Sequence, residues 1–149
     1  MVEEERGLSG TMGEMRAAFG SRDWRRTVAI YEKKRESFRA DRGLRVEAGC
    51  LAARALIALG RRSAGRLIVR GVAAATYRKA THYEFLAWAF LDLEQYKDAA
   101  KACQQAEALR QAEQTIASPE LHPRGEMDAL CSAMPEDAVR IFEELIHLG

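Results

Sequence analysis

The sequence repeats itself at a fixed spacing between positions 44 and 113. Ala53 aligns with Ala87, and Gly65 aligns with Ala99, both with an offset of 34. The same offset relates Leu56 to Phe90, Arg62 to Tyr96 and Val69 to Cys103. A period of about 20 to 50 residues indicates an array of supersecondary units that bury their apolar faces by stacking. The chain is therefore expected to be built of serial helix–turn–helix units.

Apolar residues within each unit recur at helical spacing. One stripe in the second unit contains Leu86, Ala87, Phe90 and Leu93, and after a break at Glu94 and Gln95 a second contains Tyr96, Ala99, Ala100, Cys103 and Ala106. The small residues Ala87 and Ala99 would let two antiparallel helix axes approach closely. The break between the stripes is interpreted as a tight turn.

The outer parts of the chain repeat the pattern more weakly. Trp24, Thr27 and Tyr31 have the spacing of Tyr96, Ala99 and Cys103. They precede the matching positions of the middle unit by an offset of 38, as Trp24 precedes Arg62, which predicts a loop insertion around residues 39–43. Ala138 and Phe142 repeat Ala99 and Cys103 with an offset of 39. Four hairpins would then account for the chain.

Composition supports an all-α fold. Three prolines and eleven glycines interrupt 149 residues rich in helix-forming Ala, Leu, Arg and Glu. Helices are expected near residues 11–19, 23–38, 45–59, 62–77, 82–93, 96–116, 120–133 and 136–147. Thr11 to Glu14 and Thr81 to Glu84 have the form of capping boxes, which would start two of these helices. We expect one helical-repeat domain over 11–149, preceded by a flexible tail over 1–10.

The chain has features of a cytoplasmic protein without a membrane span. No run of about 20 residues lacks a charge, as a spanning helix would require, and the N-terminus is acidic, unlike a targeting presequence. The three cysteines, Cys50, Cys103 and Cys131, are widely spaced in apolar helical contexts. They are expected to be buried thiols rather than disulfides or metal ligands.

The repeat resembles the tetratricopeptide repeat (TPR). The better-matched unit carries Tyr83, Leu86, Ala87, Phe90, Ala99, Cys103 and Ala106, and the middle unit Gly49, Ala52, Ala53, Leu56, Gly65 and Val69. The segment after Met134 also resembles the second helix of a pentatricopeptide repeat, a related RNA-binding unit. The TPR resemblance implies a right-handed superhelix of about four hairpins, whose first helices line a concave groove that holds a peptide or a partner helix.

The resemblance also implies which residues face that groove: Glu47, Arg54, Glu84, Trp88 and Leu91. Arg54 and Trp88 are attractive anchors because Arg and Trp are enriched at binding hot spots. The alternative is that Trp88 fills the core between hairpins and Arg54 is solvated. Some members of the family grip a chaperone's C-terminal carboxylate, but only Arg16 here has a suitable side chain.

Charge is distributed unevenly along the chain. Residues 20–80 carry a net charge of +11 and residues 81–149 a net charge of −8, within an overall +1. Arg61, Arg62, Arg66 and Arg70 form a basic patch, the last three on one helix stripe. The patch is either a solvated convex face or a docking surface for an acidic partner or for phosphates. Opposite charge in the two halves also allows head-to-tail self-association.

Motifs for chemistry are missing from the sequence. His82, His122 and His147 have no metal-ligand spacing, and Gly7 to Gly10 lacks the lysine of a phosphate-binding loop. We therefore expect a non-enzymatic adaptor or scaffold without cofactor or metal, which binds a peptide or helix of another protein on its concave or basic face. The alternative is an RNA-associated helical-repeat protein that uses the arginine-rich stripe.

Overall fold

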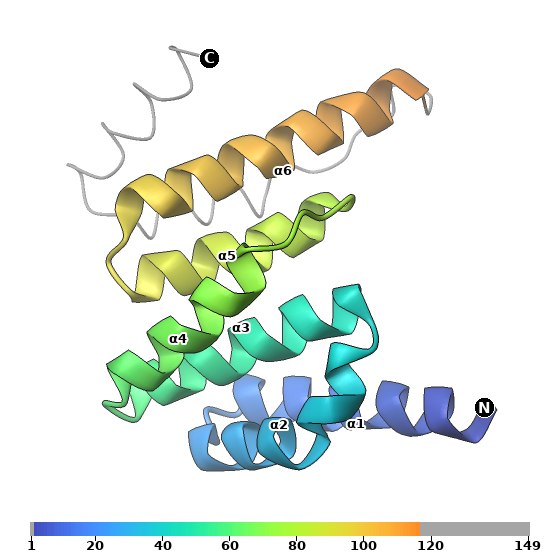
Figure 1. Cartoon of the computed structure of the whole chain (residues 1–149), viewed down its shortest axis with the longest axis vertical. Helices are drawn as coiled ribbons and strands as arrows, with labels where there is room; N and C mark the ends of the chain where they lie inside the picture. The colour runs from blue at the N-terminus through green and yellow to red at the C-terminus, as the bar shows by residue number, and fades with distance from the viewer. Residues whose placement is uncertain (1, 117–149) are drawn as a thin grey trace. The chain divides into compact units, whose positions relative to one another are not determined.

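The computed structural model describes residues 2–116, with side chains over residues 7–114. Every regular element in this part of the chain is a helix, which confirms the all-α fold class. The six helices are α1 (Val2–Gly20), α2 (Trp24–Arg39), α3 (Arg42–Ala58), α4 (Arg62–Ala73), α5 (Ala80–Asp92) and α6 (Tyr96–Ile116) (Figure 1). The predicted helices at 120–133 and 136–147, with Cys131, lie outside the described residues.

The chain divides into two compact units between Thr76 and Tyr77, within the range predicted as one domain. Unit 1 contains α1 to α4, and unit 2 contains α5 and α6. None of the helices over residues 2–116 is both long enough and apolar enough to cross a bilayer.

The three turns within the helix pairs repeat one another bond for bond. In each turn the first residue after a positive-φ residue donates its backbone N–H to a carbonyl of the preceding helix: Asp23 to Ala18, Arg61 to Leu56 and Gln95 to Phe90. The positive-φ residues are Arg22, Gly60 and Glu94, and their separations equal the two offsets found between the units in the sequence. This geometry is that of a Schellman turn, which satisfies the last carbonyls of a helix. Both offsets are therefore confirmed as the spacing of the turns.

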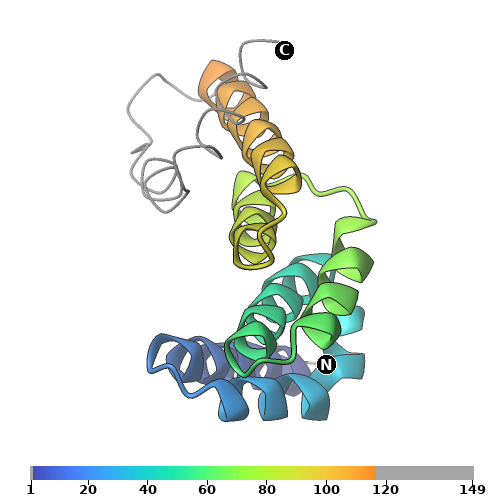
Figure 2. The ribbon, with the colours of Figure 1, turned by 90° about the vertical axis from the view of Figure 1, so that its left-hand side faces the viewer.

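Unit 1 is assembled around α3, which contacts α1, α2 and α4 (Figures 1 and 2). The α3–α4 hairpin thereby lies on the α1–α2 hairpin. A core cluster joins α1, α2 and α3 through Met12, Met15, Phe38, Ala48, Leu51 and Ala52. Within the α3–α4 hairpin Gly65 is buried against the backbone of α3. The small residues predicted to allow a close helix contact, Ala87 and Ala99, are fully buried, as is Ala53 at the position that aligns with Ala87.

Several predicted helix boundaries are wrong, and one of them is the end of the helix predicted at 62–77, which lies at Ala73. The helix expected to begin at residue 11 begins at Val2, so the segment assigned to a tail is helical from that residue. The loop insertion expected around 39–43 is also wrong, because α2 continues to Arg39 and α3 begins at Arg42. Asp41 makes the short connection possible, because its carboxylate accepts a hydrogen bond from the N–H of Leu44 at 3.1 Å and caps α3.

Neither predicted capping box starts a helix. Thr11 lies inside α1, where its hydroxyl donates to the carbonyl oxygen of Gly7 at 2.7 Å. Helix α5 begins at Ala80, so Thr81 is already helical, and the carboxylate of Glu84 pairs with Arg110. Threonine followed by glutamate at this spacing also suits a helix interior when the helix extends further upstream.

Candidate functional site

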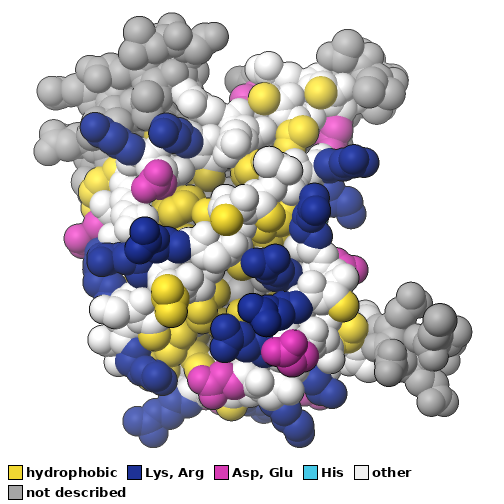
Figure 3. Space-filling view, viewed as in Figure 1, with side chains coloured by type: hydrophobic (Ala, Val, Ile, Leu, Met, Phe, Trp, Pro, Cys, Tyr) yellow, Lys and Arg dark blue, Asp and Glu magenta, His cyan; other side chains and the backbone are white. Residues whose placement is uncertain are grey.

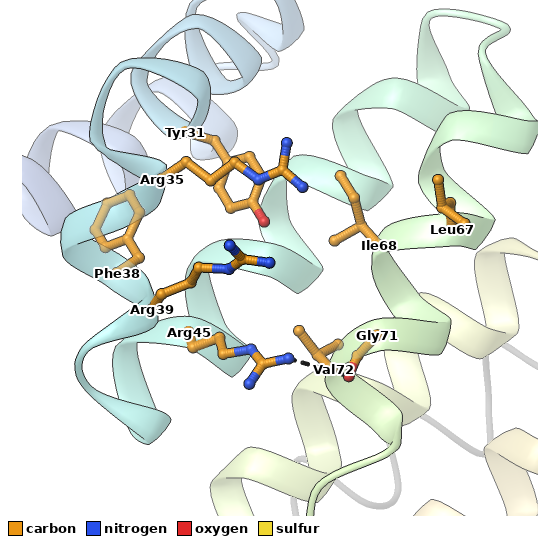
Figure 4. A pocket seen from close by; sticks show the side chains of 9 residues that line it. All are labelled: Tyr31, Arg35, Phe38, Arg39, Arg45, Leu67, Ile68, Gly71 and Val72. Atoms are coloured by element: carbon orange, nitrogen blue, oxygen red, sulfur yellow. Dashed lines mark hydrogen bonds between the residues drawn. The ribbon is translucent and has the colours of Figure 1, made fainter.

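A pocket of about 110 Å³ opens in unit 1 between α2, α3 and α4. Three arginine side chains and a set of apolar groups line it: Tyr31, Arg35, Phe38, Arg39, Arg45, Leu67, Ile68, Gly71 and Val72. Figure 4 shows the arginines of α2 and α3 extending toward α4 across the space between these helices. This combination of charge and apolar surface makes it a candidate binding site.

Helical periodicity places these residues together. Tyr31, Arg35 and Arg39 are four residues apart on α2 and therefore share one stripe of that helix. On α4, Ile68 and Val72 are likewise four residues apart. The absence of a side chain at Gly49 lets α4 pack closely on α3, since a Cβ there would lie 3.0 Å from Cγ1 of Val72. The α4 wall of the pocket is thus fixed by its contact with α3.

The three guanidinium groups of the pocket differ in how they are held. Arg45 donates a hydrogen bond to the carbonyl oxygen of Gly71 at 3.3 Å, which orients it along the pocket wall. Arg39 lies 3.8 Å from the carboxylate of Glu36, and both side chains are exposed. Arg35 is exposed and makes no ion pair with any described residue. Positive charge at this recess is therefore only weakly compensated, which favours an anionic ligand.

The pocket also has an apolar side. Phe38 and Val72 are buried, Ile68 is half-buried, and Leu67 at the rim is 73% exposed. The ring of Tyr31 stacks on Phe38 with centroids 6.2 Å apart, and Figure 4 shows its hydroxyl directed into the pocket. Figure 3 shows Lys and Arg side chains gathered around apolar surface over α2 to α4. Such a site suits a ligand that combines negative charge with an apolar group.

The predicted basic patch lies on α4 and its N-cap. Arg66 and Arg70 are exposed, Arg62 is half-buried, and Arg61 is the N-cap residue without a side-chain capping bond. None of the four lines the pocket, although exposed Leu67 follows Arg66 directly. The arginines that do line the pocket lie on α2 and α3 and were not among the predicted site residues. The four-residue spacing from Tyr31 along α2 was the available signal for two of them.

The predicted groove residues of unit 1 are held by neighbouring side chains. Arg16 of α1 donates to both carboxylate oxygens of Glu47 on α3, each at 2.6 Å. The hydrogen bonds to Glu47 raise the pKa of Arg16. The guanidinium of Arg54 lies 4.9 Å from the ring centroid of Phe19, within cation–π range. These contacts tie α3 to α1.

The other predicted groove residues belong to unit 2. Glu84 is buried and pairs with Arg110 of α6, so it joins the two helices of this hairpin. Trp88 and Leu91 are half-buried on α5. The structure thus places Glu47 and Arg54 in one unit, and Glu84, Trp88 and Leu91 in the other.

The two described cysteines, Cys50 and Cys103, are buried thiols, as predicted. Burial raises the pKa of the Cys50 thiol, and the nearby Arg54 charge opposes that shift. Over the described residues, no group of three or more His, Cys, Asp and Glu side chains is placed to hold a metal ion.

No family model, curated protein or solved structure matches the chain.

Proposed function

We propose that this protein is a non-enzymatic interaction module, an adaptor or scaffold built of TPR-like helix hairpins. The three turns with identical hydrogen bonds support the repeat, because they recur at the spacing at which the small contact residues recur. The residues that carry the TPR resemblance in the two units support it further, because all of them are buried except Phe90, which is half-buried. A fourth hairpin and a right-handed superhelix remain part of this proposal.

The binding face we propose is the basic pocket of unit 1 and its surroundings on α4. The observation that carries this proposal is the convergence of Arg35, Arg39 and Arg45 on one apolar recess. Exposed Leu67 beside it would add apolar area, and the exposed arginines of the basic patch would extend the positive field along α4. An acidic peptide or helix of a partner protein, with one apolar side chain for the recess, complements this face.

Affinity capture from the native cell with matched variants tests the proposal. The pocket variant is Arg35→Glu with Arg39→Glu, and the control is Arg26→Glu with Lys33→Glu. All four side chains are exposed on α2, and both variants change the net charge equally. We expect a protein partner that survives nuclease treatment, is lost with the pocket variant and is retained with the control. Equal retention or equal loss in both variants contradicts the proposed face.

RNA association is the second candidate, and Tyr31 among the three arginines is the observation that favours it. Aromatic and guanidinium groups together can stack and neutralise single-stranded nucleic acid. If this alternative holds, the affinity for a labelled single-stranded RNA falls steeply as salt is added. A plot of log affinity against log salt concentration then has a slope of several units. An RNA affinity that does not change with salt rejects this alternative. It is also rejected if bound proteins are lost when the pocket arginines are replaced but not on nuclease treatment.

A further inference from the structure

We infer that the pocket between α2 and α4 is a phosphate-monoester site, which recognises a phosphorylated side chain in the partner protein. The inference rests on the proposed function and deepens it, since it specifies the anion that the pocket accepts. It follows from the number of guanidinium groups, from how they are held, and from the apolar wall beside them.

Charge balance in the pocket favours a ligand with more than one negative charge. Arg35, Arg39 and Arg45 bring three positive charges to one recess, and Glu36 is the only described carboxylate in ion-pairing range of any of them, at 3.8 Å. One carboxylate satisfies a single guanidinium fork. A phosphomonoester carries about −1.5 to −2 charges and three strong acceptor oxygens at neutral pH. It therefore fits three converging arginines better than a glutamate or aspartate side chain does.

The arginines reach the recess from two helices, α2 and α3. Arg45 is held against α4 by its hydrogen bond to the carbonyl oxygen of Gly71, which uses part of its five-donor fork and leaves the remaining donors available. Arg35 and Arg39 extend from α2 in the same direction, toward α4 (Figure 4). Several guanidinium donors at one small recess can bind an anion with several acceptor oxygens. The Tyr31 hydroxyl, which points into the same space, is a further donor.

The apolar wall of the pocket indicates what carries the phosphate. Ile68 and Val72 form this wall directly beside the guanidinium groups. The carbon part of a phosphorylated side chain can pack on it while the phosphate reaches the arginines. Inorganic phosphate would gain nothing from that wall. An organic phosphomonoester on a peptide is thus the expected ligand class.

The test uses the full chain and fluorescent degenerate peptides in four forms, with a central phosphotyrosine, phosphoserine, glutamate or unmodified tyrosine. Fluorescence anisotropy at about 0.15 M salt limits contributions from distant charges. We expect a phosphorylated form to bind at least about tenfold more tightly than the glutamate and unmodified forms, as charge-assisted hydrogen bonds imply. The variant R35E/R39E should lose this preference, and the control R26E/K33E should keep it.

A second variant addresses geometry rather than charge. Arg45→Lys keeps the positive charge but loses the planar fork, so it should reduce the preference for phosphate while circular dichroism shows an intact fold. Equal binding of phosphorylated and glutamate peptides overturns the inference, and if that binding is still lost in R35E/R39E the proposed function stands. Absence of any phosphate preference, or tighter binding of a single-stranded RNA that depends on the same arginines, also overturns it.

Discussion

A Cβ atom placed on Gly65 of α4 would lie 2.8 Å from the carbonyl oxygen of Ala53 on α3. Such a contact is too close for carbon and a backbone oxygen, so the hairpin depends on glycine at this position. The equivalent position is Thr27 in the first hairpin and Ala99 in the third, by the register of the turns. The second hairpin therefore has the tightest requirement at its close-contact position.

Gly65→Ala should destabilise the chain by about 1 to 3 kcal/mol, because α4 must move away from α3. The matched control is Gly71→Ala in the same helix, where a Cβ meets nothing within 4 Å. Alanine is the better helix former, so the control should gain about 0.5 to 1 kcal/mol. Urea unfolding measures both. Equal effects at the two sites would contradict the close helix contact.

The Arg16–Glu47 pair should give a measurable but modest coupling. Arg16 is more than half exposed and Glu47 is mostly buried, so solvent screens the attraction in part. A double-mutant cycle with Arg16→Gln and Glu47→Gln should yield about 0.5 to 1 kcal/mol. Added NaCl should reduce it, as screening requires. A coupling of zero in urea unfolding at low salt would show that this pair does not tie α1 to α3.

The buried pair of unit 2 should be far less tolerant. Glu84→Gln leaves Arg110 beside an uncharged group in a buried site, which should cost about 3 to 5 kcal/mol. Glu113→Gln, on the exposed surface of α6, is the control and should change stability by less than about 0.5 kcal/mol. Thermal unfolding followed by circular dichroism distinguishes the two. Similar midpoints would be incompatible with a buried Glu84–Arg110 pair.

Burial of Cys50 predicts a pH dependence of stability. The folded state raises the pKa of this thiol, so above the unfolded value of about 8.5 the unfolded chain loses a proton that the folded chain keeps. Stability is therefore retained below that pH and declines as pH rises beyond it. Urea unfolding at pH 8 to 10 should show a steeper decline for the wild type than for Cys50→Ala, by up to about 1.4 kcal/mol per pH unit. Parallel declines would argue against an un-ionised Cys50.

Periodicity made the hairpins predictable. The two offsets between the repeat units located the turns, and small residues such as Ala87 and Ala99 located the close helix contacts. Both features are local or repeat along the chain, so a single sequence contains them. The first residues of the helices were harder to predict from the sequence. Thr11 and Thr81 have side chains that suit a cap or a helix interior, and only the upstream backbone decides between the two.

The candidate pocket could not be predicted as a whole. Arg35 and Arg39 share a stripe of α2, but their proximity to Arg45 and to the apolar wall depends on how α4 packs on α3. Likewise, Glu84 has the sequence context of a surface carboxylate, and its partner Arg110 lies on the following helix. Contacts between helices determine both arrangements. The basic patch could be predicted from the sequence because its residues lie close together on α4 and at its N-cap.

The proposed partner surface consists of Arg35, Arg39 and Arg45. Isothermal titration calorimetry with a purified partner, comparing R35E/R39E with R26E/K33E, tests it most directly. We expect at least about a tenfold loss of affinity for the first variant, as charged contacts at a binding centre imply, and wild-type affinity for the second. The same affinity in both variants would contradict it.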